Sequence, residues 1–222
     1  LGGRVAQLNR VFLTNDEATE ILNPMMKELV NHSNIKVFTN SDIEKLEGYI
    51  GNFKATVKRK PRYVTAKCTA CGKCAQVCPV EVSDEFNLGL SKRKAIYMPY
   101  KDAVPKIFTI DETACTKCGE CLKVCEPNAI VLDSKPETSD IEAGTIVVAT
   151  GYDPYMPVGE YRYGEHRDVI TQLQLERIMS GNGPTVGRVI QPSTGKEPSS
   201  VAFILCVGSR NPKRPYCSRV CC

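Results

Sequence analysis

Two cysteine runs of identical spacing constrain this chain more than any other feature of its sequence. The first run comprises Cys68, Cys71, Cys74 and Cys78, and the second comprises Cys115, Cys118, Cys121 and Cys125. Zinc sites usually pair two Cys-x-x-Cys turns across roughly 12–20 residues, whereas each run here has four thiols within eleven residues. This spacing is typical of ferredoxins. It predicts two [4Fe–4S] clusters, with a pair of zinc sites as the alternative.

The fourth cysteine of each run lies too far along the chain to complete the cluster that the first three begin. In two-cluster ferredoxins it ligates the other cluster. We therefore expect two ligand sets: Cys68, Cys71, Cys74 and Cys125 for cluster 1, and Cys115, Cys118, Cys121 and Cys78 for cluster 2. The 36 residues at positions 79–114 exceed what a compact ferredoxin needs, which predicts a hairpin or docking insertion around residues 87–104.

The remaining composition excludes several classes of protein. The 29 Lys and Arg residues against 25 Asp and Glu give a net charge of +4, but they are too scattered to indicate nucleic-acid binding. The longest apolar run, residues 201–207, is far shorter than the ~20 residues that span a bilayer. With no secretory leader, the cysteines indicate cytoplasmic metal or redox chemistry rather than disulfides. Because the first residue is Leu1, we expect a piece of a longer protein.

The segments on either side of the cysteine block carry α/β patterns. Before it, we expect a helix capped by Asn23-Pro24 and running to His32, a short strand at residues 35–39, and a hairpin of residues 43–49 and 53–60 that turns at Gly51-Asn52. After it, we expect a buried strand at residues 145–149, a helix from Thr171 through Met179, a linker at 180–199 and a second buried strand at 201–207.

Two further features stay open when they are judged from the residues alone. The strand ending at Thr150-Gly151 is compatible with a close approach to a flavin, but such strand ends are common and no G-x-G-x-x-G motif precedes it. Cys206 lies in an apolar run and is typical of a small buried hydrophobe. Two interpretations stay open for Cys217, Cys221 and Cys222, as metal ligands or as unrelated thiols.

Longer motifs in order along the chain resemble the A subunit of heterodisulfide reductase. Beside the two cysteine runs, they comprise Gly2-Gly3-Arg4-Val-Ala-Gln-Leu, Thr14-Asn15-Asp16, Lys60-Pro-Arg-Tyr-Val64, Arg93-Lys-Ala-Ile-Tyr97, Ala149-Thr-Gly-Tyr-Asp-Pro154, and residues 200–210 and 215–222. Together they cover essentially the whole chain, and the combination is specific.

The resemblance implies an α/β fold built around an inserted domain. Residues 1–60 and 136–198 would form part of a thioredoxin-reductase-like FAD domain, the latter with a linker, and residues 61–135 an inserted α+β ferredoxin domain with two [4Fe–4S] clusters. Residues 199–222 would begin a second Rossmann-like domain.

The resemblance also implies cofactor sites outside the ferredoxin insert. It implies FAD beside Gly2, Gly3, Arg4, Thr150 and Gly151, and a third, irregular [4Fe–4S] cluster on Cys206, Cys217, Cys221 and Cys222. Family members carry a Cys-x-x-Cys pair after the Thr-Asn-Asp motif. This chain has Glu17 and Glu20 there, which puts any redox or ligand role of that pair in doubt.

The function implied by the resemblance is that of an oxidoreductase component in an anaerobe. It would pass electrons between FAD and iron–sulfur clusters in flavin-based bifurcation and reduction of the CoM-S-S-CoB heterodisulfide. Its partners would be the B and C subunits, a hydrogenase or formate dehydrogenase, and ferredoxin, in a cytoplasmic hetero-oligomer without a membrane span or nucleic acid. Two alternatives are a non-enzymatic ferredoxin-type electron carrier and a related component of a quinone-linked complex.

Overall fold

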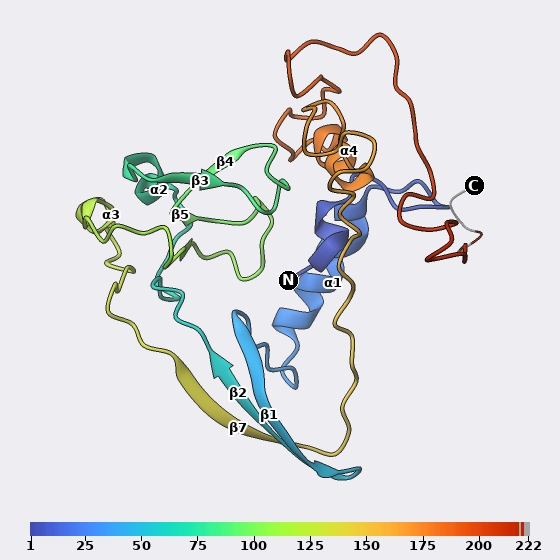
Figure 1. The fold of residues 1–222 in the computed structure, drawn as a ribbon. Coiled ribbons are helices and arrows are strands. Elements are labelled where there is room, and N and C mark those ends of the chain that lie inside the picture. The colour runs from blue at the N-terminus through green and yellow to red at the C-terminus, as the bar shows by residue number, and fades with distance from the viewer. Residues whose placement is uncertain (218, 220–222) are drawn as a thin grey trace.

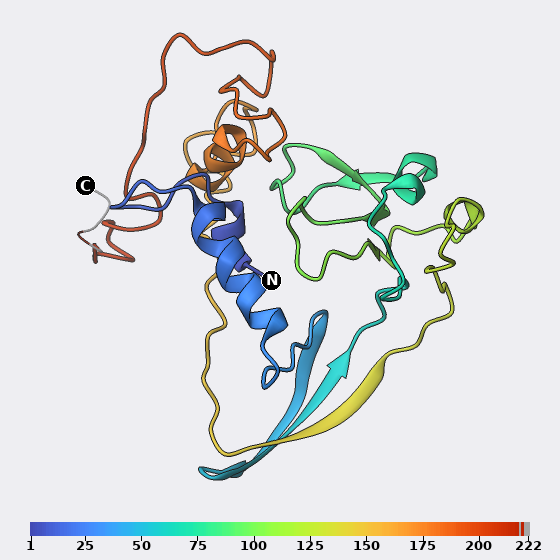
Figure 2. The same ribbon diagram turned by 180° about the vertical axis from the view of Figure 1, so that it is seen from behind.

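The computed structural model describes residues 1–217 and 219 and arranges them as a mixed α/β chain (Figure 1). A three-stranded sheet, in the order β1-β2-β7, lies at one end of the molecule, and the cysteine-rich block lies at another. The 3-10 helix η1 (Gly3–Gln7) packs beside α1 (Ala18–Asn31) and α4 (Gln172–Met179). Seen from behind, α1 runs between the sheet and α4 (Figure 2).

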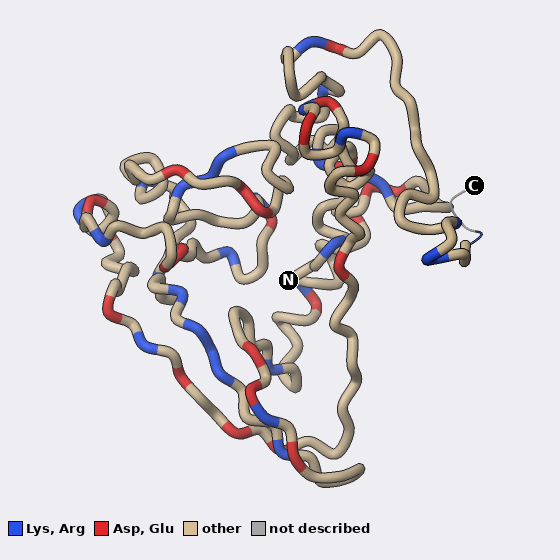
Figure 3. The backbone as a smooth tube through the Cα atoms, viewed as in Figure 1, with Lys and Arg blue, Asp and Glu red and all other residues tan. Residues whose placement is uncertain are grey.

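The strands β1 (Ser41–Tyr49) and β2 (Asn52–Arg59) form the predicted hairpin. Tyr49 pairs with Asn52, so the two-residue turn is Ile50-Gly51, one residue earlier than expected. Gly51 has a φ of +92°, a conformation that glycine adopts without strain in tight hairpin turns. The charged residues of β2 are Lys and Arg, and β2 lies beside β7, whose charged residues are Asp and Glu (Figure 3). The hairpin prediction is confirmed, with a shift of one residue in its turn.

The third strand, β7 (Glu137–Ala143), is not predicted by the sequence pattern. It pairs antiparallel with β2, and Arg59 lies opposite Glu137 with an Nη2–Oε2 distance of 2.6 Å. Its sequence is mostly polar and exposed, so backbone pairing and such ion pairs hold it rather than a buried apolar face. As a consequence, the chain leaves the sheet at the end of β2 and returns to it at the start of β7, and these two points are paired with each other.

The helix α1 begins earlier than the Asn23-Pro24 cap that the sequence suggests. Its N-cap is Glu17, and Pro24 lies inside the helix. Ala18 is completely buried and its N–H donates to the carbonyl of Asn9 at 3.1 Å. Burial of Ala18 and Met26 on one face therefore outweighs the helix-breaking tendency of Pro24, which lacks the N–H that would bond to Glu20.

Three predicted strands, at residues 35–39, 145–149 and 201–207, are wrong in the described structure. These segments are irregular, and the two apolar ones are exposed: Val147 is 86% exposed and Phe203 is 65% exposed. Apolar β-branched residues form a strand only when a neighbouring strand accepts their backbone hydrogen bonds. No strand of residues 1–217 and 219 pairs with any of the three.

The cysteine-rich block contains two small hairpins and a compact core. β3 (Glu81–Ser83) pairs with β4 (Lys92–Lys94), and β5 (Ile96–Tyr97) pairs with β6 (Thr109–Ile110). The predicted insertion around residues 87–104 therefore consists of the second part of the β3–β4 turn, β4, β5 and the first part of the long β5–β6 loop. The core side chains are Tyr63, Val64, Ile96, Phe108, Ile110, Ala129 and Ile130.

The helix α4 has the start that the sequence predicts. The Thr171 hydroxyl accepts a hydrogen bond from the N–H of Gln174, and the Gln174 side chain accepts one from the N–H of Thr171. This reciprocal capping box satisfies two donors that the first turn otherwise leaves free. The predicted helix from Thr171 through Met179 is confirmed.

A buried arginine on α4 joins three distant segments of the chain. The Arg177 side chain is fully buried and lies 4.8 Å from the centre of the Phe86 ring. Its guanidinium donates to Asn87 Oδ1 at 3.0 Å, to the Gln7 carbonyl at 3.3 Å and to Asn182 Oδ1 at 2.9 Å. Arg177 thereby ties the β3–β4 turn of the cysteine-rich block to η1 and α4.

Substituting Arg177 by Met should loosen this junction. The acceptors on Gln7, Asn87 and Asn182 would lose their donor, at a cost of about 2 kcal/mol. We expect amide hydrogen exchange in the β3–β4 turn to accelerate about 30-fold, which mass spectrometry can measure. Arg188→Met is the matched control, because the Arg188 side chain is 71% exposed. Equal exchange in the two variants would contradict the role of Arg177.

Candidate iron–sulfur site

The two cysteine runs fold as two copies of one turn. A short helix follows the second cysteine of each run: α2 (Lys73–Val77) and α3 (Glu120–Lys123). Each is preceded by a left-handed glycine, Gly72 with φ +82° and Gly119 with φ +79°. Because L side chains rarely adopt these angles, glycine at this point permits the sharp turn between the second and third cysteines.

Backbone amides approach the sulfur of the first cysteine in the same way in both copies, and one further amide approaches Cys125. The N–H of Ala70 donates to Cys68 Sγ at 3.4 Å, and the N–H of Lys117 donates to Cys115 Sγ at 3.4 Å. The N–H of Ala129 donates to Cys125 Sγ at 3.3 Å. Hydrogen bonds of this kind stabilise negative charge on thiolate sulfur and so help to set the reduction potential of a cluster.

The hydrophobic core of the block lies against both runs. Six of the eight cysteines are partly buried and pack on it: Cys68, Cys74, Cys78, Cys115, Cys121 and Cys125. The second cysteines of the two runs, Cys71 and Cys118, are exposed. The core therefore brings the two runs together, and each run presents one thiol to solvent.

One cavity collects thiols from both runs. It is lined by Cys78 of the first run and by Cys115, Cys118 and Cys121 of the second, with apolar side chains around them that include Ile96, Ile110 and Leu132. These four cysteines are the set expected for cluster 2. In the first run, the charges of Cys68 and Cys71 both contribute to raising the pKa of Cys74.

The spread of the thiols bears on the zinc alternative. In residues 1–217 and 219, no three His, Cys, Asp or Glu side chains converge closely enough to hold a single metal ion. A tetrahedral zinc ion with Zn–S bonds of about 2.3 Å needs its thiolates about 3.8 Å apart. A cube of four irons is larger and needs a wider ligand set. The two alternatives therefore differ in the ligand spread that each of them needs.

Burial and neighbouring groups change the acidity of several of these thiols. Burial raises the pKa of Cys74 to about 11, and neighbouring thiolates contribute to this shift. Burial likewise raises the pKa of Cys121, with contributions from Cys115, Cys118 and Cys78. Thiols in such surroundings lose their protons when a metal replaces them. By contrast, the backbone N–H of Lys73 lowers the pKa of the exposed Cys71.

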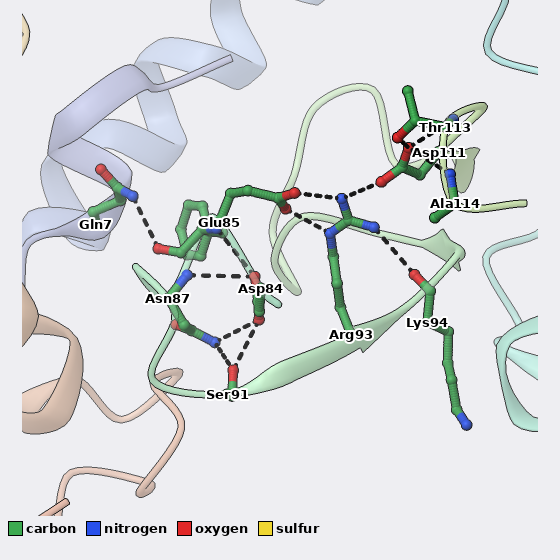
Figure 4. Close-up of polar contacts among 11 residues, drawn as sticks. Gln7, Asp84, Glu85, Asn87, Ser91, Arg93, Lys94, Asp111, Thr113 and Ala114 are labelled. Carbon is green, nitrogen blue, oxygen red and sulfur yellow. Dashed lines mark hydrogen bonds and ion pairs between the residues drawn. The ribbon is translucent and has the colours of Figure 1, made fainter. Parts of the chain in front are cut away.

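A polar network braces the β3–β4 turn and connects it to the second run (Figure 4). The Arg93 guanidinium is almost buried, binds both carboxylate oxygens of Glu85 at 2.6 and 2.7 Å, and binds Asp111 Oδ2 at 2.8 Å. Hydrogen bonds from Thr113, and then the charge of Arg93, hold the pKa of Asp111 below its usual value. Asp111 also accepts the N–H of Ala114, directly before Cys115.

The role of Arg93 is not evident from the sequence. Its guanidinium lies 3.7 Å from the centre of the Tyr97 ring. It also bridges Glu85 to Asp111, and Asp111 lies 18 residues after Arg93. In the sequence, the Arg93–Tyr97 motif contributes only to the family resemblance. An arginine four residues before a tyrosine does not by itself reveal such a contact, because the spacing is also common on exposed strands.

The residues expected beside FAD do not share one site in the described structure. Gly2 has a φ of +101° and is closely packed, since a Cβ at this position would lie 2.8 Å from Leu22 Cδ2. The Arg4 side chain bonds to Gln7 Oε1 at 3.0 Å. Gly3 lines a cavity that also includes Arg62 and Tyr97, whereas Thr150 and Gly151 are exposed in an irregular segment.

The four cysteines near the end of the sequence are only partly described. Cys206 and Cys217 are half-buried and free of disulfides, and the N–H of Arg219 donates to Cys217 Sγ at 3.3 Å. Cys206 has a φ of +61° and follows an irregular segment rather than ending a buried strand. Cys221 and Cys222 lie outside the described residues. Glu17 and Glu20 lie at the start of α1.

Comparison with known proteins identifies relatives of the whole chain. Residues 67–130 match the 4Fe-4S dicluster domain family. The chain is 52% identical to one of the iron-sulfur A subunits of the CoB–CoM heterodisulfide reductase of Methanopyrus kandleri, and 45% identical to the A subunit of the ferredoxin:CoB-CoM heterodisulfide reductase of Methanosarcina mazei. All of the chain is aligned in both cases, but it spans only 35% and 29% of the length of these relatives.

No helix in the described part of the chain is long and apolar enough to cross a membrane.

The shared cavity predicts which cluster depends on which fourth cysteine. Cys78→Ser should disturb the cluster held by Cys115, Cys118 and Cys121 and leave the other cluster largely intact, because Cys78 lines the cavity of the second run. Cys125→Ser is the matched variant and should have the opposite effect. Electron paramagnetic resonance of the reduced protein distinguishes the two centres. Loss of only the cluster held by Cys68, Cys71 and Cys74 in Cys78→Ser would refute the crossed arrangement.

Proposed function

We propose a function from one premise: over its whole length, this chain is a homologue of the A subunit of heterodisulfide reductase. The chain contains a two-cluster iron–sulfur domain, and its relatives are oxidoreductase subunits. We infer that it relays electrons through two [4Fe–4S] clusters within a flavoprotein that takes part in heterodisulfide reduction. The single observation that carries this proposal is the meeting of both cysteine runs on one small core.

The protein residues have defined tasks in this relay. When bound, each cluster accepts and releases one electron at a time. Cys68, Cys71, Cys74 and Cys125 would hold cluster 1, and Cys115, Cys118, Cys121 and Cys78 would hold cluster 2. Core residues such as Ile96 and Ile110 exclude water between the two runs. The amides of Ala70, Lys117 and Ala129 stabilise charge on the ligating sulfurs.

The domain organisation that we propose follows the pairing of β2 with β7. Residues 61–135 would form the inserted ferredoxin domain, because the sheet partners Arg59 and Glu137 flank it. Residues 1–60 and 136–198 would belong to an FAD domain in the longer protein, and residues 199–222 to the start of another domain. FAD beside Gly2, Gly3, Arg4, Thr150 and Gly151 would then require segments beyond this sequence to complete its site.

The wider assembly is proposed from the names of the relatives. The names of the Methanococcus maripaludis and Methanosarcina acetivorans proteins include hydrogen or formate, and ferredoxin or F420H2, among the reactants. We propose a cytoplasmic complex with a hydrogenase or formate dehydrogenase, with ferredoxin and with the B and C subunits, in which FAD bifurcates electron pairs. The alternative is a ferredoxin-type carrier in which the flanks are only a scaffold.

Flavin content separates the proposed function from the carrier alternative. We expect the full-length protein to be purified with about one FAD per chain and to transfer electrons from reduced FAD to its clusters in anaerobic stopped-flow absorbance measurements. Residues 1–222 alone should retain the two clusters but bind FAD poorly, because they lack the segment that would hold its pyrophosphate. Full-length protein without flavin would support the carrier, and stoichiometric FAD on residues 1–222 would show that the flavin site is misassigned.

The third cluster proposed for Cys206, Cys217, Cys221 and Cys222 has a separate test. Full-length protein carrying Cys217→Ala and Cys221→Ala should hold about four irons fewer than the parent protein. Cys71→Ala is a useful reference, because it should affect only the ferredoxin-type clusters. Unchanged iron in the double variant would mean that these cysteines are not cluster ligands.

A further inference from the structure

A groove lined by lysine and aromatic side chains lies beside the first cysteine run. We call it the lysine groove, and its lining includes Lys94, Lys101, Lys106, Tyr97, Tyr100 and Met98. Most of these residues belong to the β5–β6 loop and its flanking strands. This loop is part of the chain that makes the block longer than a compact ferredoxin needs.

The lysine groove reaches the loop that carries the first three cysteines. Ala70 and Ala75 form part of its lining, and these residues flank Cys71 and Cys74. Phe108, which also lines the groove, lies 4.0 Å from the position that a Cβ on Gly72 would occupy. Cys71 itself is exposed. A molecule seated in the groove would therefore lie beside the edge of cluster 1 that is closest to solvent.

The wall of the groove is held in place from behind. The Tyr100 ring stacks on Phe86 with centroids 4.8 Å apart and an interplanar angle of 15°. Phe86 in turn lies under the buried guanidinium of Arg177. The neighbouring Ala103 is buried. The β5–β6 loop is thus a supported surface rather than a free loop, which reduces the entropy that a partner must overcome on docking.

The charge of the groove is positive where it faces solvent. Lys101 and Lys106 are exposed, and no Asp or Glu of residues 1–217 and 219 forms an ion pair with either of them. Lys94 forms an ion pair with Glu81, with a distance of 2.9 Å between Nζ and Oε1. The sequence from position 95 to position 110 contains a single acidic residue, Asp102. Two lysine charges therefore remain available to a ligand.

The second run offers no comparable surface in the described structure. Its exposed thiol, Cys118, has Lys117 and Lys123 nearby, but Lys123 is paired with Glu120 at 2.6 Å. The cavity beneath Cys118 is the thiol-lined one and is apolar apart from its cysteines, Thr116 and Lys117. Of the two exposed thiols, only Cys71 adjoins the lysine groove.

We propose that the lysine groove docks a small acidic iron–sulfur electron carrier of the ferredoxin class, and that cluster 1 exchanges electrons with it. This inference rests on the proposed function, since it requires a redox-active cluster on Cys68, Cys71 and Cys74. One electron moves between the partner's cluster and cluster 1, one being oxidised as the other is reduced, and no bond or proton is transferred. The lysines attract the carrier and orient it, which raises the rate of productive encounter.

The test uses the full-length protein with Lys101→Glu and Lys106→Glu together. Stopped-flow absorbance would give the second-order rate constant for electron exchange with an acidic two-cluster ferredoxin at several salt concentrations. We expect the rate constant at low salt to fall at least tenfold and its decline with added salt to flatten. Lys101→Gln with Lys106→Gln should have an intermediate effect.

A matched control carries Lys27→Glu and Lys196→Glu, which change the net charge equally at two exposed lysines outside the groove. This variant should exchange electrons at nearly the rate of the parent protein. Reduction by dithionite and the iron content should be unchanged in all variants, which separates a docking defect from loss of cluster 1. A groove variant that exchanges electrons as fast as the parent, or a control that is slowed equally, would overturn the proposal. If dithionite fails to reduce any cluster in the parent protein, the proposed function itself fails.

Discussion

The packing of both cysteine runs on one small core is the constraint on which the rest of the site depends. Six thiols lie against seven buried side chains, so a change in the core moves the ligands of both centres together. A core of this size gives limited stability by itself, and burial raises the pKa of thiols such as Cys74. On the proposed function, the clusters would complete the interior of the block as well as provide its chemistry. Folding of the block and cluster binding are coupled on this account.

Two attachments join this block to the rest of the chain. At the sheet, Arg59 of β2 lies opposite Glu137 of β7, so the block leaves and re-enters through paired strands. At its other side, Arg177 binds the β3–β4 turn and η1 at once. Attachment at two separate places limits rotation of the block. Such a restriction suits an electron relay, because transfer rates fall steeply as the distance between redox centres grows.

The sequence predicts the parts of this structure that depend on local signals. Cysteine spacing indicates the ferredoxin block, and Thr171 with Gln174 indicates the start of α4. It does not predict β7, which is polar and held by pairing with β2, or the junction at Arg177, whose contacts lie 90 and 170 residues away. The apolar segments at residues 145–149 and 201–207 have strand composition, but composition cannot reveal whether a neighbouring strand is present.

The magnetic interaction between the two clusters tests the central claim most directly. The measurement is electron paramagnetic resonance of residues 1–222 carrying Cys217→Ala and Cys221→Ala, loaded with iron and sulfide and fully reduced without oxygen. If both clusters lie on the shared core, the spectrum should be broadened and split by spin–spin coupling, and partial reduction should simplify it. A spectrum equal to the sum of two independent clusters at every level of reduction would contradict the account.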